Sequence, residues 1–306
     1  MTAGAAMSSM PYLLSFISPP ASRALDEDLV RRIASTLPDA GAPVWLAPGE
    51  AAEVPFGTEK ADLSGLLEKL RGGLGGRPVD LNLLPAGARR KKLLVADMDS
   101  TMIAQECVDE LADLLGLKEK VAAITERTMR GELDFEPALR ARVALLKGIT
   151  LEEIGTLIRE RITPMAGARE LVGTMKAHGA HTALVSGGFT LFTGPVAARI
   201  GFEEHRSNEL IVDEGRLAGT VAEPILGREA KREALIELRT RFGLQSTDTL
   251  GVGDGANDLA MLDEAGLGVA FRAKPAVAEM ADARIDHCDL TALLYLQGYR
   301  REEFAV

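Results

Sequence analysis

Residues 91–101, with the sequence Lys-Lys-Leu-Leu-Val-Ala-Asp-Met-Asp-Ser-Thr, constrain the fold of this 306-residue chain more than any other stretch. The apolar run at 93–96 has the length and composition of a buried parallel strand. Asp97 and Asp99 follow it directly, and the alternation of side chains along a strand places both on the same side. The carboxyl end of such a strand opens onto the crevice where α/β sheets bind ligands. The stretch therefore predicts an α/β fold with a functional site at this strand end.

The two carboxylates repel each other unless a cation lies between them or one of them takes up a proton. A hard divalent cation such as Mg²⁺, which prefers oxygen ligands and accepts a phosphate as a further ligand, suits this pair. Ser100 and Thr101 add hydroxyl groups beside it. A simpler interpretation is a strand end with solvated acidic turn residues, and the residues downstream decide between the two.

The charge and composition of the chain narrow the classes of partner. The formal net charge is -10, which argues against a nucleic-acid backbone as a partner. The sequence has no apolar run long enough for a transmembrane helix, and residues 1–10 lack the positively charged start of a secretory signal. Cys107 and Cys288 belong to no C-x-x-C motif. We therefore expect a cytoplasmic protein with free thiols and no membrane partner.

Residues 1–88 are interpreted as a small α+β domain that carries no dense catalytic cluster. Glycines at 72–76 form a hinge-like break, and residues 78–88 are expected to be a linker. Trp45, the sole tryptophan, is expected to be a core residue. The predicted elements are strands at 11–17 and 44–47 and helices at 26–37 and 63–70.

Residues 89–306 are interpreted as a second domain. Its core comprises residues 89–104 and 164–306, where strands and helices alternate as in a doubly wound sheet. Residues 105–163 form a helical insert directly after the first polar loop, where a cap can close over the site. The insert is predicted to contain helices at 105–115, 118–130, 135–146 and 151–159.

Two further predicted strands also end in polar loops. Ser186 follows the strand at 181–185, and Gly187 and Gly188 allow backbone N–H groups to approach an anion. Taken alone, Ser-Gly-Gly is equally consistent with an ordinary glycine-rich turn.

The loop at 253–258 reads Gly-Asp-Gly-Ala-Asn-Asp and is the more specific signal. Asp254 is a candidate metal ligand, whereas Asp258 either joins the site or only caps the helix that follows. Lys231, near the start of a predicted helix at 229–242, can neutralise phosphate charge or, like most helical lysines, face water.

In order and spacing, these residues resemble the motifs of the haloacid dehalogenase (HAD) superfamily over about residues 91–283. Asp97-Met-Asp-Ser-Thr resembles the first motif and Ser186 the second, while Lys231 and residues 253–258 resemble the third and fourth. Within the superfamily the chain is similar to the phosphoserine phosphatase family, because Glu106 lies nine residues after Asp97.

The segment 135–148, which contains Arg142, also resembles the lid signature of that family. Residues 1–88 weakly resemble the ACT-like domain of its longer bacterial members, through which a homodimer can form. The resemblance thus implies a doubly wound, Rossmann-like HAD core with a helical cap and a small N-terminal α+β domain.

The resemblance further implies Mg²⁺-dependent hydrolysis of O-phospho-L-serine, the last step of L-serine biosynthesis, through an aspartyl-phosphate intermediate. It makes Asp97 the nucleophile and Asp99 the general acid and base. A carboxylate oxygen of Asp97, the backbone carbonyl of Asp99 and the side chain of Asp254 would bind Mg²⁺.

The substrate-binding residues follow from the same resemblance. It assigns Glu106 to the substrate ammonium and Arg142 to its carboxylate, which would select an amino acid over a sugar phosphate. The residues that it places around the phosphoryl group are Ser186, Gly187, Lys231 and Asn257, with Asp258 orienting Lys231. Without the resemblance, Glu106 is equally well explained as an acid in the first turn of a helix and Arg142 as a charge on the cap surface.

Three alternatives to a phosphoserine phosphatase remain open from the sequence. A related phosphatase or phosphotransferase would act on another small phosphate, such as phosphothreonine or phosphohomoserine. A glycosyltransferase would use Asp-x-Asp to bind a metal–nucleotide-sugar complex, but the 253–258 loop and Lys231 have no role there. A non-catalytic serine sensor would not need the full set of catalytic side chains.

Overall fold

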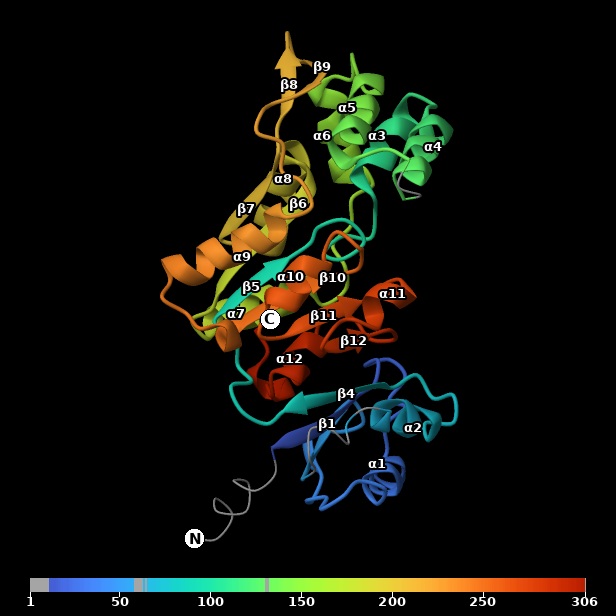
Figure 1. Cartoon of the computed structure of the whole chain (residues 1–306), viewed down its shortest axis with the longest axis vertical. Coiled ribbons are helices and arrows are strands. Elements are labelled where there is room, and N and C mark those ends of the chain that lie inside the picture. The colour runs from blue at the N-terminus through green and yellow to red at the C-terminus, as the bar shows by residue number, and fades with distance from the viewer. Residues whose placement is uncertain (1–10, 58–62, 64, 130–131, 306) are drawn as a thin grey trace.

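The computed structural model describes residues 11–57, 63, 65–129 and 132–305, so the expectation about residues 1–10 concerns residues outside that description. Three parts follow one another along the long axis of the molecule (Figure 1). A helical cap lies at one end, a parallel sheet with its helices lies in the middle, and an antiparallel sheet lies at the other end.

The central sheet is parallel, and its strand order β12-β11-β10-β5-β6-β7 places β5 (Leu93–Ala96) between β10 and β6. The chain runs outward from β5 to β7 on one side and then from β10 to β12 on the other. The order therefore reverses between β5 and β10, which is where such sheets bind ligands. The remaining strands are β6 (His181–Phe189), β7 (Glu204–Asn208), β10 (Thr249–Gly253), β11 (Gly268–Phe271) and β12 (Ala283–Ile285).

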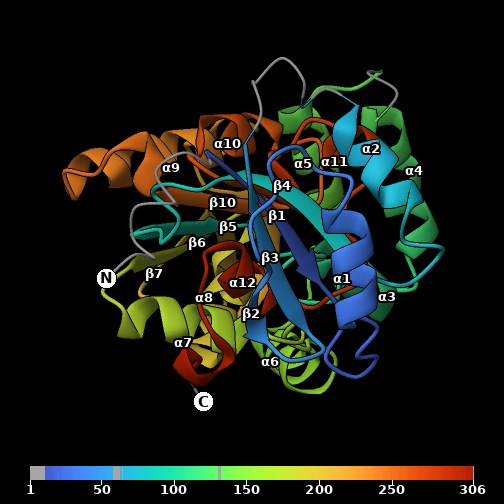
Figure 2. The ribbon, with the colours of Figure 1, turned by 90° about the horizontal axis from the view of Figure 1, so that it is seen from below.

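Both faces of this sheet are covered by helices (Figure 2), which confirms the doubly wound fold. Leu93 and Val95 of β5 pack with α9 (Ala230–Arg241) and α10 (Leu259–Glu264). Leu94 and Ala96 belong to the cluster on the opposite face, because successive strand side chains alternate. That cluster includes residues of α7 (Ala168–Ala177), α8 (Thr190–Ile200) and α12 (Ala292–Leu296), while the short α11 (Pro275–Ala278) lies on the α9 side.

The cap contains the four predicted helices, with ends that differ from the prediction by up to two residues. Thr150 and Glu153 form a capping box that explains where the last helix begins. The bounds are α3 (Cys107–Leu114), α4 (Lys118–Met129), α5 (Phe135–Leu145) and α6 (Leu151–Glu160). A hairpin of β8 (Leu210–Asp213) and β9 (Arg216–Val221), inserted between β7 and α9, also reaches the cap.

The N-terminal part has the element order β1 (Tyr12–Ile17), α1 (Glu27–Ala34), β2 (Val44–Ala47), β3 (Ala51–Phe56), α2 (Leu66–Gly72) and β4 (Asp80–Pro85). Its strands form an antiparallel sheet in the order β2-β3-β1-β4. Asp26 caps α1 by accepting the Leu29 N–H. One face of the sheet packs on α1 and α2, and Trp45 is partly buried against this cluster.

The prediction of a linker at 78–88 is wrong, because β4 occupies most of that segment. Its first four residues, Asp-Leu-Asn-Leu, alternate between polar and apolar, but the polar side chains are buried as well, so β4 is buried on both faces. Its two polar side chains form hydrogen bonds with backbone groups at and just after β12 of the central sheet. Asp80 accepts the N–H groups of residues 286–288, and Asn82 both donates to and accepts from the backbone of Arg284.

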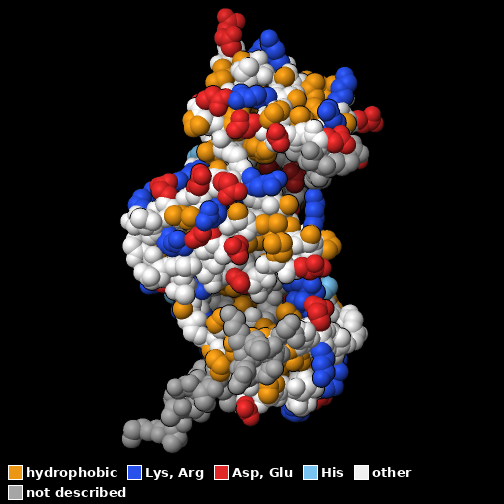
Figure 3. Space-filling model, in the orientation of Figure 1, with side chains coloured by type: hydrophobic (Ala, Val, Ile, Leu, Met, Phe, Trp, Pro, Cys, Tyr) orange, Lys and Arg blue, Asp and Glu red, His pale blue; other side chains and the backbone are white. Residues whose placement is uncertain are grey.

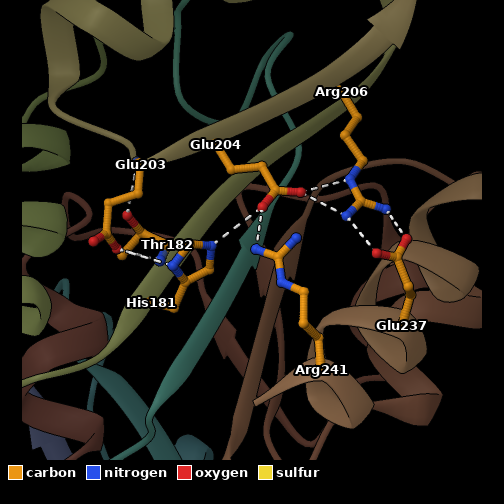
Figure 4. A network of polar contacts seen from close by, with 7 residues as sticks. All are labelled: His181, Thr182, Glu203, Glu204, Arg206, Glu237 and Arg241. Atoms are coloured by element: carbon orange, nitrogen blue, oxygen red, sulfur yellow. Dashed lines mark hydrogen bonds and ion pairs between the residues drawn. The ribbon is translucent and has the colours of Figure 1, made fainter.

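The free edge of β7 is protected by charged side chains (Figure 4). Glu204 accepts hydrogen bonds from Arg206 and from Arg241 of α9, each at 2.7 Å. Arg206 also pairs with Glu237 of α9. Such inward pairing of charges discourages another strand from adding to the edge.

None of the described helices combines the length and the apolar character that crossing a bilayer requires. Cys107 and Cys288 are both buried free thiols. On the face drawn in Figure 3, lysine and arginine side chains are interspersed with aspartate and glutamate.

Candidate active site

The carboxyl ends of β5, β6 and β10 lie side by side, so the three predicted polar loops converge. Asp97 leaves β5 with its N–H bonded to the Val252 carbonyl at 3.0 Å, which places it beside the loop that follows β10. The strand order therefore brings together the polar loops that the sequence places after these three strands.

Asp97, Lys231 and Asp258 form a buried charged cluster at the centre of the site. Lys231 Nζ lies 2.7 Å from Asp97 Oδ1 and 2.6 Å from Asp258 Oδ1. Burial opposes the charge on Lys231, but the Asp97 and Asp258 carboxylates outweigh it and raise the pKa of the ammonium. Lys231 therefore faces the site and not the solvent.

The remaining oxygens of these two carboxylates differ in their surroundings. Asp258 Oδ2 accepts the Gly255 N–H at 3.0 Å, so both oxygens of Asp258 are engaged. Asp97 Oδ1 also accepts the Met98 N–H at 2.7 Å, whereas Oδ2 has no hydrogen bond from any described residue. Burial, together with the Asp258 charge, raises the pKa of Asp97 well above its usual range, while Lys231 lowers it.

Gly253 is required by the close approach of Asp258 to the backbone. A Cβ at this position would lie 2.3 Å from Asp258 Cγ, far inside van der Waals contact. Only glycine allows the Asp258 side chain to pass this close and reach Lys231.

Asp97, Asp254 and Asp258 each place one carboxylate oxygen within 4.8 Å of the others, which gathers acidic oxygens of the kind that a metal ion requires. Thr101 donates to Asp254 Oδ1 at 3.0 Å and orients that side chain. Burial and the Asp258 charge raise the pKa of Asp254 to about 6. An all-oxygen donor set of this kind fits a hard divalent cation.

Asp99 lies in the same crevice but outside this acidic triad. Its Oδ1 accepts the Cys107 N–H at 3.2 Å, and its Oδ2 lies 3.4 Å from where a Cβ of Gly188 would be. Burial raises the pKa of Asp99 to about 7, and the Glu106 carboxylate adds to this effect. At neutral pH this carboxyl can therefore exchange a proton.

Ser186 and its glycines form the opposite wall. Ser186 Oγ accepts the Gly188 N–H at 2.9 Å. Phe135, the first residue of cap helix α5, lies 3.7 Å from where a Cβ of Gly187 would be. The cap therefore lies directly over this loop.

Glu106 and Arg142 both lie on the cap side of the site. Glu106 precedes α3, and its Oε1 accepts a 2.7 Å hydrogen bond from Ser100. Arg142 is partly buried on α5 and donates to the Ala138 carbonyl at 3.3 Å. Burial lowers its pKa, opposed by the Asp109 and Glu106 charges.

The remaining predicted residue, Asn257, is exposed and close to Gly255. Three contacts at the site were not predicted from the sequence: Thr101 with Asp254, Ser100 with Glu106 and Phe135 with Gly187. Thr101 and Ser100 adjoin Asp97-Met-Asp, so their position could have indicated these contacts. Phe135 begins the segment that resembles the lid signature, but that resemblance did not name Gly187 as its neighbour.

A family model described as haloacid dehalogenase-like hydrolase matches residues 94–263. The chain is 46% identical over 204 residues to a phosphoserine phosphatase from Haemophilus influenzae, an alignment that covers 67% of this chain and 65% of the relative. It is 48% identical over 210 residues to a phosphoserine phosphatase from Albidiferax ferrireducens, covering 67% of this chain and 89% of the relative. The chain thus spans slightly less than two thirds of the first relative and most of the second.

Solved structures agree with these alignments. A HAD family hydrolase from Salmonella enterica serovar Typhi superimposes with a TM-score of 0.80 at 29% identity, covering 93% of this chain and 97% of that one. A phospho-aspartyl intermediate analogue of phosphoserine phosphatase gives a TM-score of 0.62 at 41% identity, covering 67% and 98%. With its converging loops and its helical cap, the chain therefore belongs to the haloacid dehalogenase-like hydrolases and, within them, to the phosphoserine phosphatase family.

Proposed function

We propose that the chain hydrolyses O-phospho-L-serine to L-serine and phosphate through an aspartyl-phosphate on Asp97, as the last step of L-serine biosynthesis. The observation that carries the proposal is the buried Asp97–Lys231–Asp258 cluster, beside an Asp99 whose pKa is raised to about 7. Relatives named phosphoserine phosphatase, 46% and 48% identical, support the choice of substrate.

In this proposal one carboxylate oxygen of Asp97 attacks phosphorus and the other is left to bind the cation. Lys231 lies at Oδ1 and lowers the pKa of Asp97, which favours the ionised carboxylate against the larger upward shift caused by burial and Asp258. Asp99 donates its proton to the departing serine oxygen and then takes a proton from the water that hydrolyses the aspartyl-phosphate. A pKa of about 7 suits both steps at neutral pH.

We assign the cation to Mg²⁺, with ligands from the side chains of Asp97 and Asp254 and the backbone carbonyl of Asp99. Asp258 belongs to the acidic triad, but its two oxygens are already bonded to Lys231 and the Gly255 N–H. Asp258 therefore serves to orient Lys231. When bound, Mg²⁺ would neutralise charge on the phosphoryl oxygens.

Glu106 and Arg142 are proposed to select the amino-acid part of the substrate. Each lies on the cap side, and Arg142 interacts electrostatically with Glu106, so a zwitterion can fit between opposite charges. Arg142 would bind the substrate carboxylate, and Glu106 would bind its ammonium. The phosphoryl oxygens would be bound by Ser186, the Gly187 N–H, Lys231 and Asn257.

The organisation of the whole chain is also a proposal. We infer an N-terminal domain at 1–88 and a catalytic domain at 89–306, a homodimer formed through the N-terminal domain, and a cytoplasmic location. Sedimentation of the purified protein tests the dimer: a single species at monomer mass over the working concentration range would exclude it.

The proposed activity is tested by phosphate release from O-phospho-L-serine, phosphothreonine and a sugar phosphate. Wild type is compared with Asp97→Asn, with Mg²⁺ and after chelation. We expect release from phosphoserine that is lost with the substitution or the chelator and restored by Mg²⁺. Release only from the other phosphates would contradict the recognition by Glu106 and Arg142, and no release at all would favour a non-catalytic sensor.

A further inference from the structure

Asn208, the last residue of β7, uses its buried side-chain amide to join segments that are distant in sequence. Its Nδ2 donates to the Gly187 carbonyl at 2.9 Å and to the Leu226 carbonyl at 3.4 Å. Its Oδ1 accepts the Leu226 N–H at 2.7 Å. Only 2% of the residue is exposed, so water cannot replace these bonds readily.

The contact with Gly187 fixes a peptide group next to the proposed phosphoryl site. The carbonyl of the Gly187–Gly188 peptide accepts from Asn208, and the N–H of the same peptide donates to Ser186 Oγ at 2.9 Å. The peptide is therefore held at both ends. Because Ser186 Oγ already accepts this N–H, its own hydroxyl hydrogen remains available for an anion.

Residues 209–225 contain the β8–β9 hairpin, and the hydrogen bonds between Asn208 and Leu226 hold the two ends of this segment together. At its other end the hairpin is bonded to the cap loop after α5. Gly148 N–H donates to the Leu217 carbonyl, and Leu217 N–H donates to the Ile149 carbonyl, both at 2.8 Å. Asn208 thus lies where the Gly187 loop meets the segment whose β8–β9 hairpin contacts the cap.

We propose that Asn208 is a positioning residue for phosphoryl binding, acting through the Gly187–Gly188 peptide on the Ser186 hydroxyl. The proposal rests on the proposed function, because it takes Ser186 and Gly187 as phosphoryl ligands. Without the Asn208 donor, the buried Gly187 carbonyl loses a hydrogen bond, and the peptide is free to rotate away from Ser186 Oγ.

The test compares Asn208→Ala with a control that weakens the same strand elsewhere. Thr193→Val is suitable, because buried Thr193 bonds to His205 at 3.0 Å and Ser207 at 2.7 Å, both on β7, without a hydrogen bond to Gly187. Inorganic phosphate binding is measured by calorimetry, together with kcat and KM for phosphoserine and the thermal midpoint.

We expect Asn208→Ala to weaken phosphate binding and to lower kcat/KM by about tenfold or more, the equivalent of one lost hydrogen bond in a buried site. Thr193→Val should lower the thermal midpoint but leave both binding and kcat/KM within about twofold. Should Asn208→Ala give no soluble protein, Asn208→Ser, whose side chain is too short to reach both carbonyls, replaces it.

Equal phosphate affinity in wild type and the Asn208 variant would overturn the proposal. An equal loss of phosphate affinity in Thr193→Val would also overturn the proposal, because any destabilisation of β7 would then weaken phosphate binding. The calorimetric readout does not depend on turnover, so a wild-type protein that binds phosphate but does not hydrolyse phosphoserine would contradict the proposed function alone.

Discussion

At the scale of single residues, the site depends on charged groups whose surroundings set their roles. Asp97 and Asp258 are both buried next to Lys231, yet Asp258 uses both oxygens in protein hydrogen bonds and Asp97 keeps one without such a bond. Asp99, a short distance along the chain, has its pKa raised to about 7 by burial and by Glu106. In the proposed mechanism, these differences suit the three carboxyls to attack, to proton transfer and to the orientation of Lys231.

Arg142→Gln tests substrate selection at this scale. The loss of the guanidinium should raise KM for phosphoserine by about 10- to 100-fold, which corresponds to about 1.5–3 kcal/mol for a charged hydrogen bond. An aryl phosphate without a carboxylate should be hydrolysed as before. Arg140→Gln is the matched control, because Arg140 lies on the same helix but is exposed and pairs with Glu223. An equal rise of KM for both substrates would contradict the assignment.

At the scale of elements, the charged edge of β7 gives a prediction about pH. Burial raises the pKa of Glu204, but hydrogen bonds from Arg206 and Arg241 outweigh it, so the folded pKa lies below the usual range. The resulting stabilisation is fully present above the unfolded glutamate pKa of about 4.3 and is lost as pH falls through the folded value.

Glu204→Gln should therefore lower the denaturation midpoint more at pH 7 than at pH 4. The measurement is urea unfolding of wild type and variant at both values, with Glu233→Gln in α9 as a control that lacks these arginine contacts. If Glu204→Gln lowers the denaturation midpoint by the same amount at pH 4 and at pH 7, the ion pairs of Glu204 do not contribute the pH-dependent stability expected here.

The sequence predicted the elements of the catalytic part well because their signals are local. The apolar run at 93–96, the helical spacing of the cap and the Gly-Asp-Gly turn each lie within a few neighbouring residues. Strand β4 was missed, because Asp80 and Asn82 are polar residues buried against a partner about 200 residues away. Asn208 was missed for the same reason, since its partners Gly187 and Leu226 are adjacent only in the folded chain.

At the scale of the whole molecule, the N-terminal sheet and the catalytic part share one apolar cluster. Ile17, Ala51 and Leu84 of the sheet belong to the same buried cluster as Leu94 of β5. Arg89 strengthens the contact, because it pairs with Glu53 and donates to the Leu296 carbonyl at 2.8 Å. The stability of the catalytic part should therefore depend on the N-terminal sheet.

Asp80→Ala tests this dependence, because it leaves the N–H groups of residues 286–288 without their acceptor. We expect a single unfolding transition, destabilised by about 1–3 kcal/mol. Asp28→Ala, at an exposed position of α1, is the control and should change stability little. Two separate transitions, with only the first one shifted, would show that the two parts unfold independently.

In the proposed mechanism, Asp97 carries the phosphoryl group during turnover. The most direct measurement is rapid mixing with O-phospho-L-serine, quenching, reduction of the acyl phosphate with borohydride and mass spectrometry of the peptides. We expect conversion of Asp97 to homoserine in wild type and no homoserine in Asp97→Asn. Modification of another carboxylate, or turnover without any trapped aspartate, would contradict it.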